Sequence, residues 1–223
     1  MKRTGFVIGA VVLVLLAILA VIGYRQFVQQ VPCGPDLFAG DKNGSFEIGN
    51  FKPLPFPDTY MPLPDGATDL TSWTIHARSN PLAWSSNDNR FQIKTPYGTH
   101  FLDLTGPSDA ERYPGLSQGI ALQPGRYQLS FALGQDRNNG FPGPVSGDIT
   151  TAGIFTHQQT FTTDANGDNW QTFALDVDAK SAGALQLSFG ATAGQSKPTL
   201  VRYVGLDNVS LRQYLPRYSC PAQ

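Results

Sequence analysis

Two carboxylates, Glu47 and Asp207, are the residues of this chain best placed to bind a cation. Glu47 closes the segment Asn43–Glu47 (NGSFE), and Asp207 lies in Leu206–Leu211 (LDNVSL). Each segment resembles a turn that leads into a strand, and we expect them to form the first and last strands of one sheet structure. Asp207 shares its strand parity with Val209, so its side chain should point inward, where a carboxylate needs a partner.

Calcium is the cation that such a pair would suit, because it prefers carboxylate and carbonyl oxygens. Ser45 shares the parity of Glu47 and could add its backbone carbonyl. We therefore expect a structural Ca²⁺ on Glu47, Asp207 and Ser45. The alternative is that Glu47 caps backbone amides and Asp207 makes a turn bond.

Aromatic and polar side chains in the middle of the chain could form a glycan site, which needs an aromatic platform beside amide, carboxylate or guanidinium groups. The candidates are Trp84, Tyr97, Arg137, Asn138, Asn139, His157 and Trp170. Trp73 and Trp170 lie in strand patterns and are expected in the core. Trp84 precedes a polar turn and fits either a cleft border or the core. The segment 135–147 is long enough to form a binding rim, or it is a mobile surface loop.

The residue pattern gives little support for catalysis. His76, His100 and His157 are far apart in the chain and have no close metal-ligand spacing. Gly115–Gly119 (GLSQG) matches the G-x-S-x-G pattern, but a nucleophile elbow needs a strand-to-helix turn, and here a strand is expected to follow. Asp103 and Asp109 could be imagined as a glycosidase pair, although most acidic residues lie in turns. We expect no enzymatic activity.

Alternating apolar and polar residues indicate an all-β fold. The clearest case is 126–133, where Tyr127, Leu129, Phe131 and Leu133 alternate with polar or small residues. Similar patterns predict strands near 71–77, 82–93, 100–104, 119–122, 153–162, 173–177, 185–189 and 206–211. No helical period follows residue 30, so an antiparallel β-sandwich or jelly roll is predicted. The segment 51–66 holds five prolines, which excludes a central strand and favours an extended loop; a Pro-rich ligand for another module is the alternative.

The first residues predict a membrane anchor. Gly5–Gly23 is wholly apolar, follows Lys2-Arg3 and precedes Tyr24-Arg25. At about 1.5 Å per residue it nearly spans a hydrocarbon core of roughly 30 Å. The predicted organisation is a cytoplasmic stub (1–4), an anchor (5–24), a tether (25–36), the sandwich (37–214) and a tail (215–223). A cleaved signal peptide is the alternative, and both place the domain outside the cytoplasm.

The two cysteines agree with export. Cys33 follows the tether and Cys220 lies near the end, and an oxidising compartment favours one bridge between them. Free thiols, or a lipid on Cys33, are the alternatives. The formal net charge of −1, without a basic run, gives no indication of nucleic-acid binding.

Several segments, taken in order, resemble the galactose-binding-like jelly rolls. They are Asn43–Glu47, Ser72-Trp73, Phe101–Leu104, Leu116–Ile120, Pro124–Phe131 and Leu206–Leu211. The order is most similar to the domain-of-unknown-function family 642 and to related carbohydrate-binding modules, over about residues 37–213. Ala83 stands where the family-642 pattern has an Asp. The resemblance implies an exported, non-catalytic module that often binds cell-wall polysaccharide, with a structural calcium on Glu47 and Asp207.

The function expected from the sequence is therefore carbohydrate binding by a membrane-tethered domain, with cell-wall polysaccharide or exopolysaccharide as the partner. The expected ligand residues are Trp84, Tyr97, Arg137, Asn138 and His157. A structural or adhesive envelope protein that binds another protein is the alternative, and a glycoside hydrolase is a remote one.

Overall fold

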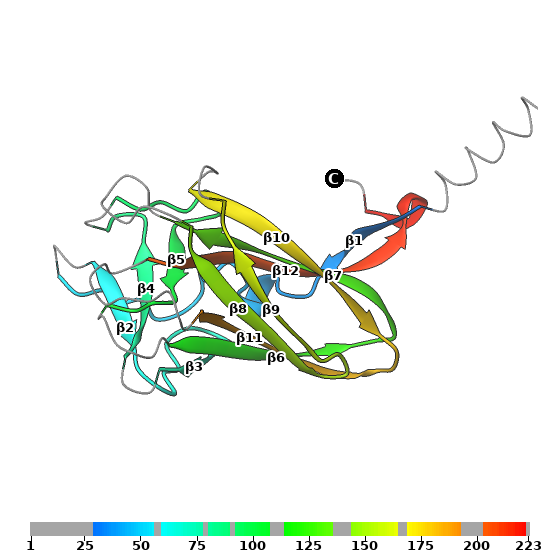
Figure 1. Ribbon diagram of the computed structural model, residues 1–223, viewed down its shortest axis with the longest axis horizontal. Helices are drawn as coiled ribbons and strands as arrows, with labels where there is room; N and C mark the ends of the chain where they lie inside the picture. The colour runs from blue at the N-terminus through cyan, green and yellow to red at the C-terminus, as the bar shows by residue number, and fades with distance from the viewer. Residues whose placement is uncertain are drawn as a thin grey trace, which may run out of the picture.

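The chain folds into two antiparallel β-sheets packed face to face (Figure 1). The computed structural model describes residues 29–55, 59–77, 80–89, 92–107, 114–135, 144–164, 169–192 and 203–221. Within these ranges the only helical elements are two short 3-10 turns, η1 (Gly40–Lys42) and η2 (Arg217–Ser219). The all-β antiparallel sandwich predicted from the alternation is confirmed, and it fits a jelly roll.

The larger sheet has seven strands and the smaller has five. The larger runs in the order β10 (Trp170–Ala179), β7 (Gly125–Gly134), β12 (Gly205–Pro216), β5 (His100–Asp103), β4 (Leu82–Ser86) and β2 (Tyr60–Leu63), and β1 (Gln30–Asp36) pairs with β12. The smaller runs β3 (Thr74–His76), β6 (Gly115–Leu122), β11 (Gly183–Ala191), β8 (Ser146–Gly153) and β9 (His157–Thr162).

The core lies between the sheets and follows the predicted alternation. The apolar residues of β7 at 127, 129, 131 and 133 are each at most 4% exposed. Phe131 packs against Phe161, Phe173 and Phe189 with ring centroids 5.1–5.8 Å apart, so it joins both sheets. Burying one such side chain contributes about 1.5–3 kcal/mol relative to leaving it in water.

The opening segment Asn43–Glu47 is a turn, and its prediction as the first strand is wrong. Asn43 and Phe46 have positive φ angles of 56° and 57°, outside the extended region that regular strand residues occupy. The Asn43 side chain holds the turn by bonding both the N–H and the carbonyl of Ile48. The expected adjacency is nevertheless present, because the Val209 N–H donates to the Gly44 carbonyl at 2.8 Å.

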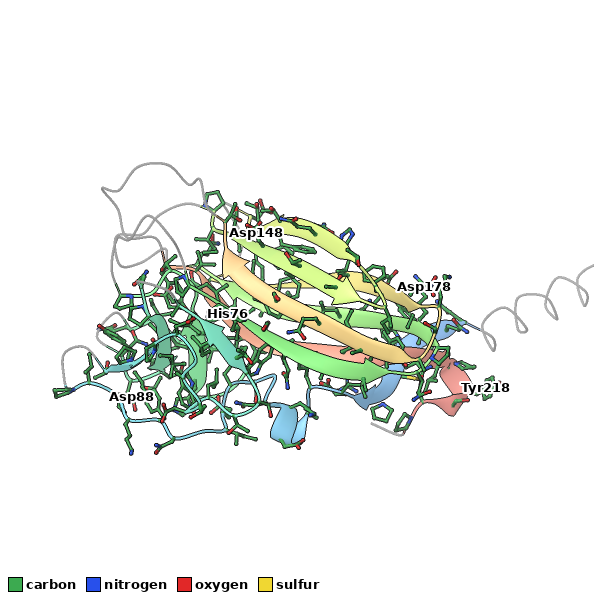
Figure 2. All side chains as sticks on the ribbon, turned by 90° about the horizontal axis from the view of Figure 1, so that it is seen from below. His76, Asp88, Asp148, Asp178 and Tyr218 are labelled. Carbon is green, nitrogen blue, oxygen red and sulfur yellow. A yellow bond between two sulfur atoms is a disulfide. The ribbon has the colours of Figure 1, made fainter. Side chains whose placement is uncertain are left out.

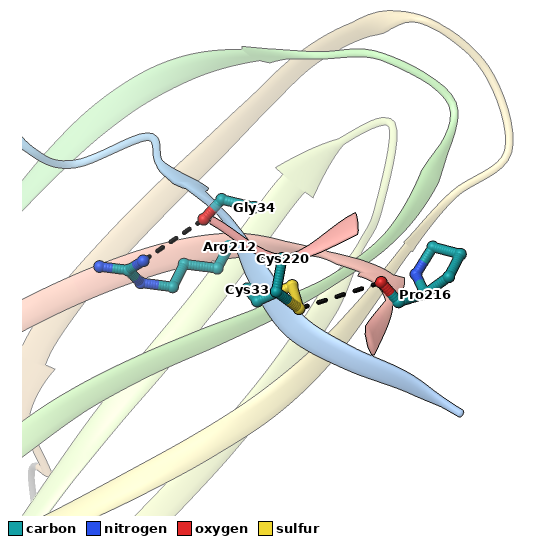
Figure 3. Close-up of a disulfide and its surroundings, with 5 residues drawn as sticks. All are labelled: Cys33, Gly34, Arg212, Pro216 and Cys220. Atoms are coloured by element: carbon teal, nitrogen blue, oxygen red, sulfur yellow. Dashed lines mark hydrogen bonds between the residues drawn. A yellow bond between two sulfur atoms is a disulfide. The ribbon is translucent and has the colours of Figure 1, made fainter. Parts of the chain in front are cut away.

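The first strand is β1, which the sequence analysis assigned to the tether. Its residues pair with the end of β12, from Gln30 opposite Pro216 to Asp36 opposite Arg212. The predicted Cys33–Cys220 disulfide is present, with Cα atoms 5.4 Å apart (Figure 3). The predicted anchor, 5–24, lies outside the described residues. Within the described part of the chain, no helix has the length and apolar character to cross a membrane.

Other boundaries differ locally from the prediction. The expected strand 153–162 is shorter than predicted: Gly153, with a φ of 89°, ends β8, and only His157–Thr162 form the next strand, β9. The Pro-rich segment does contain a short strand, β2, with Pro62 inside it, but β2 lies at the edge of its sheet. An edge strand tolerates proline because one side of its backbone forms no ladder.

Candidate functional site

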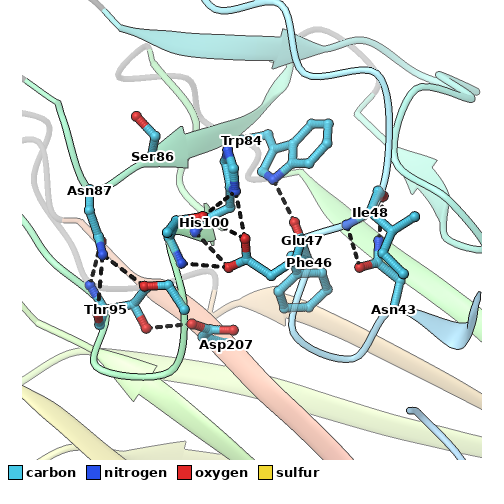
Figure 4. A network of polar contacts seen from close by, with 12 residues as sticks. Asn43, Phe46, Glu47, Ile48, Trp84, Ser86, Asn87, Thr95, His100 and Asp207 are labelled. Carbon is cyan, nitrogen blue, oxygen red and sulfur yellow. Dashed lines mark hydrogen bonds and ion pairs between the residues drawn. The ribbon is translucent and has the colours of Figure 1, made fainter. Parts of the chain in front are cut away.

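The carboxylate of Glu47 is fully occupied by donors from residues 99 and 100 (Figure 4). Its Oε1 accepts the backbone N–H groups of Thr99 (2.7 Å) and His100 (2.8 Å). Its Oε2 accepts the Thr99 hydroxyl (2.6 Å) and lies 2.8 Å from Nδ1 of His100. Partial burial alone would raise the pKa of Glu47, but the hydrogen bonds from His100 and Thr99 outweigh it and lower the pKa below its ordinary value.

Asp207 is completely buried, but not on the side that its parity predicted. It lies opposite Ala132, on the outer face of the sheet, because the register of β12 shifts between Asp207 and Ser210; the loop residue Thr95 contacts it there. The Oδ2 of Asp207 accepts the hydroxyl of Thr95, and its Oδ1 accepts the Asn208 N–H at 2.6 Å. Burial raises the pKa of Asp207 to about 7, and the nearby charge of Glu47 adds to this effect.

These contacts decide how well the two carboxylates fit a calcium ion. A carboxylate has about four lone-pair sites, and Glu47 uses four of them for hydrogen bonds. Glu47 therefore does not fit as a calcium ligand in this arrangement, and the contacts match the alternative of amide capping by Glu47 and a turn bond at Asp207. No cluster of three or more His, Cys, Asp or Glu side chains suited to a metal occurs among the described residues.

Trp84 lies in the core, which corrects its assignment to a ligand site. It is 0% exposed, its indole N–H donates to the Phe46 carbonyl at 3.0 Å, and Phe51 packs against it edge-on. A buried ring offers no surface to a sugar. Trp73 is also buried, as predicted, and donates to the Asn43 carbonyl at 3.0 Å.

The other predicted ligand residues are not brought together. Arg137, Asn138 and Asn139 lie outside the described residues. Tyr97 packs on the outer face of the seven-stranded sheet, with its hydroxyl 3.0 Å from that of Thr172. His157 begins β9 at the edge of the other sheet, where it contacts Gln159.

Trp170 and the loop 92–99 form a second apolar cluster outside the sandwich. The indole N–H of Trp170 donates to the Lys94 carbonyl at 2.8 Å, and the cluster joins Ile93, Phe101, Ala132, Trp170 and Tyr203, with Tyr97 packed against it. This loop covers one end of the outer face of β10, β7 and β12. Tyr97 marks the limit of the covered part.

Beyond Tyr97 the outer face of these three strands is polar and open to solvent. In-register rows cross the strands in the order β10, β7, β12: first Ala174, Ser130 and Ser210, then Asp176, Gln128 and Arg212. All six side chains are at least partly exposed. A row of short side chains thus lies between Tyr97 on one side and longer polar side chains on the other. We call this surface, with Tyr97, Arg126 and Tyr214, the polar strip.

The far end of the polar strip is a connected network. Asp176 accepts from Arg126 (2.5 Å) and from the Tyr214 hydroxyl (2.8 Å), and Gln128 donates to that hydroxyl at 3.0 Å. The Arg126 guanidinium lies 4.4 Å from the centre of the Tyr214 ring. The hydrogen bond from Arg126 holds the pKa of Asp176 below its ordinary value. Sequence reasoning missed this site, although the polar positions of 126–133 were its signal.

The three histidines remain in separate places. His76 contacts the Ser117 hydroxyl at 2.8 Å, but no described carboxylate bonds His76, and Ser117 is only 5% exposed. The segment Gly115–Gly119 lies along the straight strand β6, so it is no nucleophile elbow.

Comparison with known proteins adds a similarity of architecture. No protein-family model matches the chain, and no curated protein matches it. Among solved structures, a carbohydrate-binding module in complex with β-1,4-galactotriose matches with a TM-score of 0.48 and 15% identity, over 77% of this chain and 96% of that one. A xylan-binding domain from Paenibacillus barcinonensis matches with a TM-score of 0.49 and 14% identity, over 82% and 97%. The sandwich assignment rests on the strand ladders of this chain.

Proposed function

We propose that this protein is a non-catalytic module that binds carbohydrate on the polar strip and is held outside the cytoplasm by its N-terminal segment. The observation that carries the proposal is the strip itself. It combines hydrogen-bonding side chains, an aromatic residue at each end and a row of short side chains between them.

The chemistry of the polar strip suits sugar hydroxyls. A hydroxyl group both donates and accepts, and Asp176 supplies acceptors while Arg126 and Gln128 supply donors. Their mutual hydrogen bonds hold these side chains in place before a ligand arrives, which lowers the entropy lost on binding. The short side chains Ala174, Ser130 and Ser210 leave room for a sugar ring between Tyr97 and Tyr214.

Two features support a location outside the cytoplasm. The disulfide Cys33–Cys220 is typical of oxidising compartments. The apolar segment Gly5–Gly23 is long enough to serve as an anchor.

The proposal is tested by binding of the full chain, in detergent, to a glycan array that includes xylan and β-1,4-galactan. For a glycan that binds, Asp176→Ala and Tyr214→Ala should each weaken the affinity by about 10-fold, the effect of losing about 1.4 kcal/mol. The matched control is Gln158→Ala, an exposed residue on β9 of the other sheet, which should bind as the native chain does.

Three results would contradict the proposal. Binding that survives both substitutions would move the site elsewhere on the molecule. Silence on the array, together with co-purification of a specific envelope protein, would support the adhesive alternative. Release of reducing sugar would show a glycoside hydrolase.

A further inference from the structure

The end of the molecule next to the N-terminal segment has an unusual surface. The start of β1 and the end of β12 extend beyond the sandwich as a two-stranded ribbon, closed by Cys33–Cys220 (Figures 1 and 3). We define the tip as residues 29–33 and 215–221. Arg217 donates its backbone N–H to the Gln29 carbonyl at 3.0 Å, so η2 lies directly beside the point where the described chain begins.

The tip exposes several apolar side chains beside uncharged polar ones, and the charge that it carries is positive. Val31, Pro32, Leu215 and Pro216 are partly exposed, and Tyr218 is 60% exposed. Within the described residues of the tip, Arg217 is the one charged side chain and no carboxylate is present. Such a surface suits neither bulk water nor a hydrocarbon core, but it suits the boundary between them. Tyrosine is enriched at that boundary, and arginine binds lipid phosphates.

The chain length outside the structure places the tip near a membrane. Six residue steps separate Gly23, the end of the apolar run, from Gln29. A fully extended chain covers at most about 3.5 Å per residue, so the tip lies within about 20 Å of the end of the run. Tyr24 and Arg25, in between, are again an aromatic and a basic residue.

We propose that the tip docks into the interfacial layer of the bilayer that holds the N-terminal segment, through Tyr218 and Arg217. This inference rests on the membrane anchor of the proposed function. Two contacts with one membrane would fix the tilt of the domain, which a single attachment point leaves free. The Tyr214 end of the polar strip then faces the membrane, and Asp88 lies at the far end of the molecule (Figure 2).

The test uses the full chain in vesicles of phosphatidylcholine and phosphatidylglycerol. A fluorophore is attached at Gln30→Cys on the exposed start of β1, and in a second sample at Asp88→Cys as the distant control. A quencher on the lipid headgroups should quench the label at position 30 at least two-fold more than the label at position 88. Adding Tyr218→Ser and Arg217→Ser to the first sample should remove most of that difference, because the tip would leave the interface.

The outcomes separate the two proposals. If the full chain fails to float with the vesicles, the anchor itself is wrong. If it floats and the labels at 30 and 88 are quenched equally, or if the double substitution leaves the quenching at 30 unchanged, docking of the tip is wrong and the anchor stands. An unchanged thermal unfolding midpoint checks that the exposed substitutions leave the fold intact.

Discussion

At the scale of single residues, the environment rather than the residue type decides the role. Glu47 and Asp207 carry the same chemical group, yet the pKa of Glu47 is lowered and that of Asp207 is raised to about 7. Glu47 is 29% exposed and receives four donors, whereas Asp207 is fully buried with two. Hydrogen bonds to the charged carboxylate lower the pKa, and burial raises it. The hydrogen bonds outweigh burial at Glu47, and burial outweighs them at Asp207.

Calcium should therefore have little effect on stability. We expect the thermal unfolding midpoint to change by less than about 2 °C between EDTA and millimolar Ca²⁺, because the Glu47 carboxylate is occupied by protein donors. Replacing Thr99 by Val would remove the hydroxyl donor to Glu47. The same calcium measurement on this variant is compared with that on the native chain. A clear calcium-dependent rise in the native chain would instead restore the metal site on Glu47, Asp207 and Ser45.

Asp103 should make stability depend on pH. Burial raises the pKa of Asp103 to about 6, although hydrogen bonds from Thr105 and Val204 oppose it. The unfolded chain releases this proton near pH 4, so between about pH 4 and 6 the folded state binds more protons and stability falls as the pH rises. Asp103→Asn should reduce this decline in urea unfolding measured from pH 4 to 6, and the part that remains belongs to Asp207, whose pKa burial raises to about 7. A decline of the same steepness in the variant would assign it to other groups.

At the scale of elements, glycines determine how tightly Trp170 packs on its sheet. Gly134 lies opposite both Trp170 and Gly205 in the ladders. A Cβ built on Gly134 would lie 2.8 Å from the indole, and one on Gly205 would lie 2.7 Å from it. Because no side chain intervenes, the ring reaches Phe101 and the loop 92–99, which fixes the boundary of the polar strip.

Gly134→Ala should therefore destabilise the protein by about 1–3 kcal/mol, the usual cost of overpacking. Urea unfolding measures this loss. Gly119→Ala is the matched strand control, since its Cβ would meet only the end of the flexible Gln186 side chain, at 3.2 Å. Equal losses for the two variants would show that strand conformation, and not contact with Trp170, causes the effect.

At the scale of the whole molecule, the first and last strands form one seam. β1 pairs with β12, and the disulfide links residues 187 positions apart. The seam connects the N-terminal segment to a strand at the middle of the larger sheet, so the two chain ends leave the domain together.

Removing the disulfide should cost about 4–5 kcal/mol in the chain-entropy model, because the closed loop includes nearly the whole domain. The double variant Cys33→Ser and Cys220→Ser, compared with the native chain in urea, measures this cost. A loss below about 1 kcal/mol would contradict the chain-entropy estimate for this disulfide.

The sequence by itself determined the all-β class, the buried faces of β7 and β11 and the Cys33–Cys220 pair. Alternation is a local pattern that indicates which side of a strand is apolar. Two cysteines allow only one intramolecular pairing. Only the tertiary structure decided that Trp84 is core, that Asn43–Glu47 is a turn and that residues 30–36 form a strand. It also assembled the polar strip from segments near 97, 126–130, 172–176 and 210–214. The adjacency of these segments depends on strand order and register. Both arise from long-range packing, so a local residue pattern does not predict them.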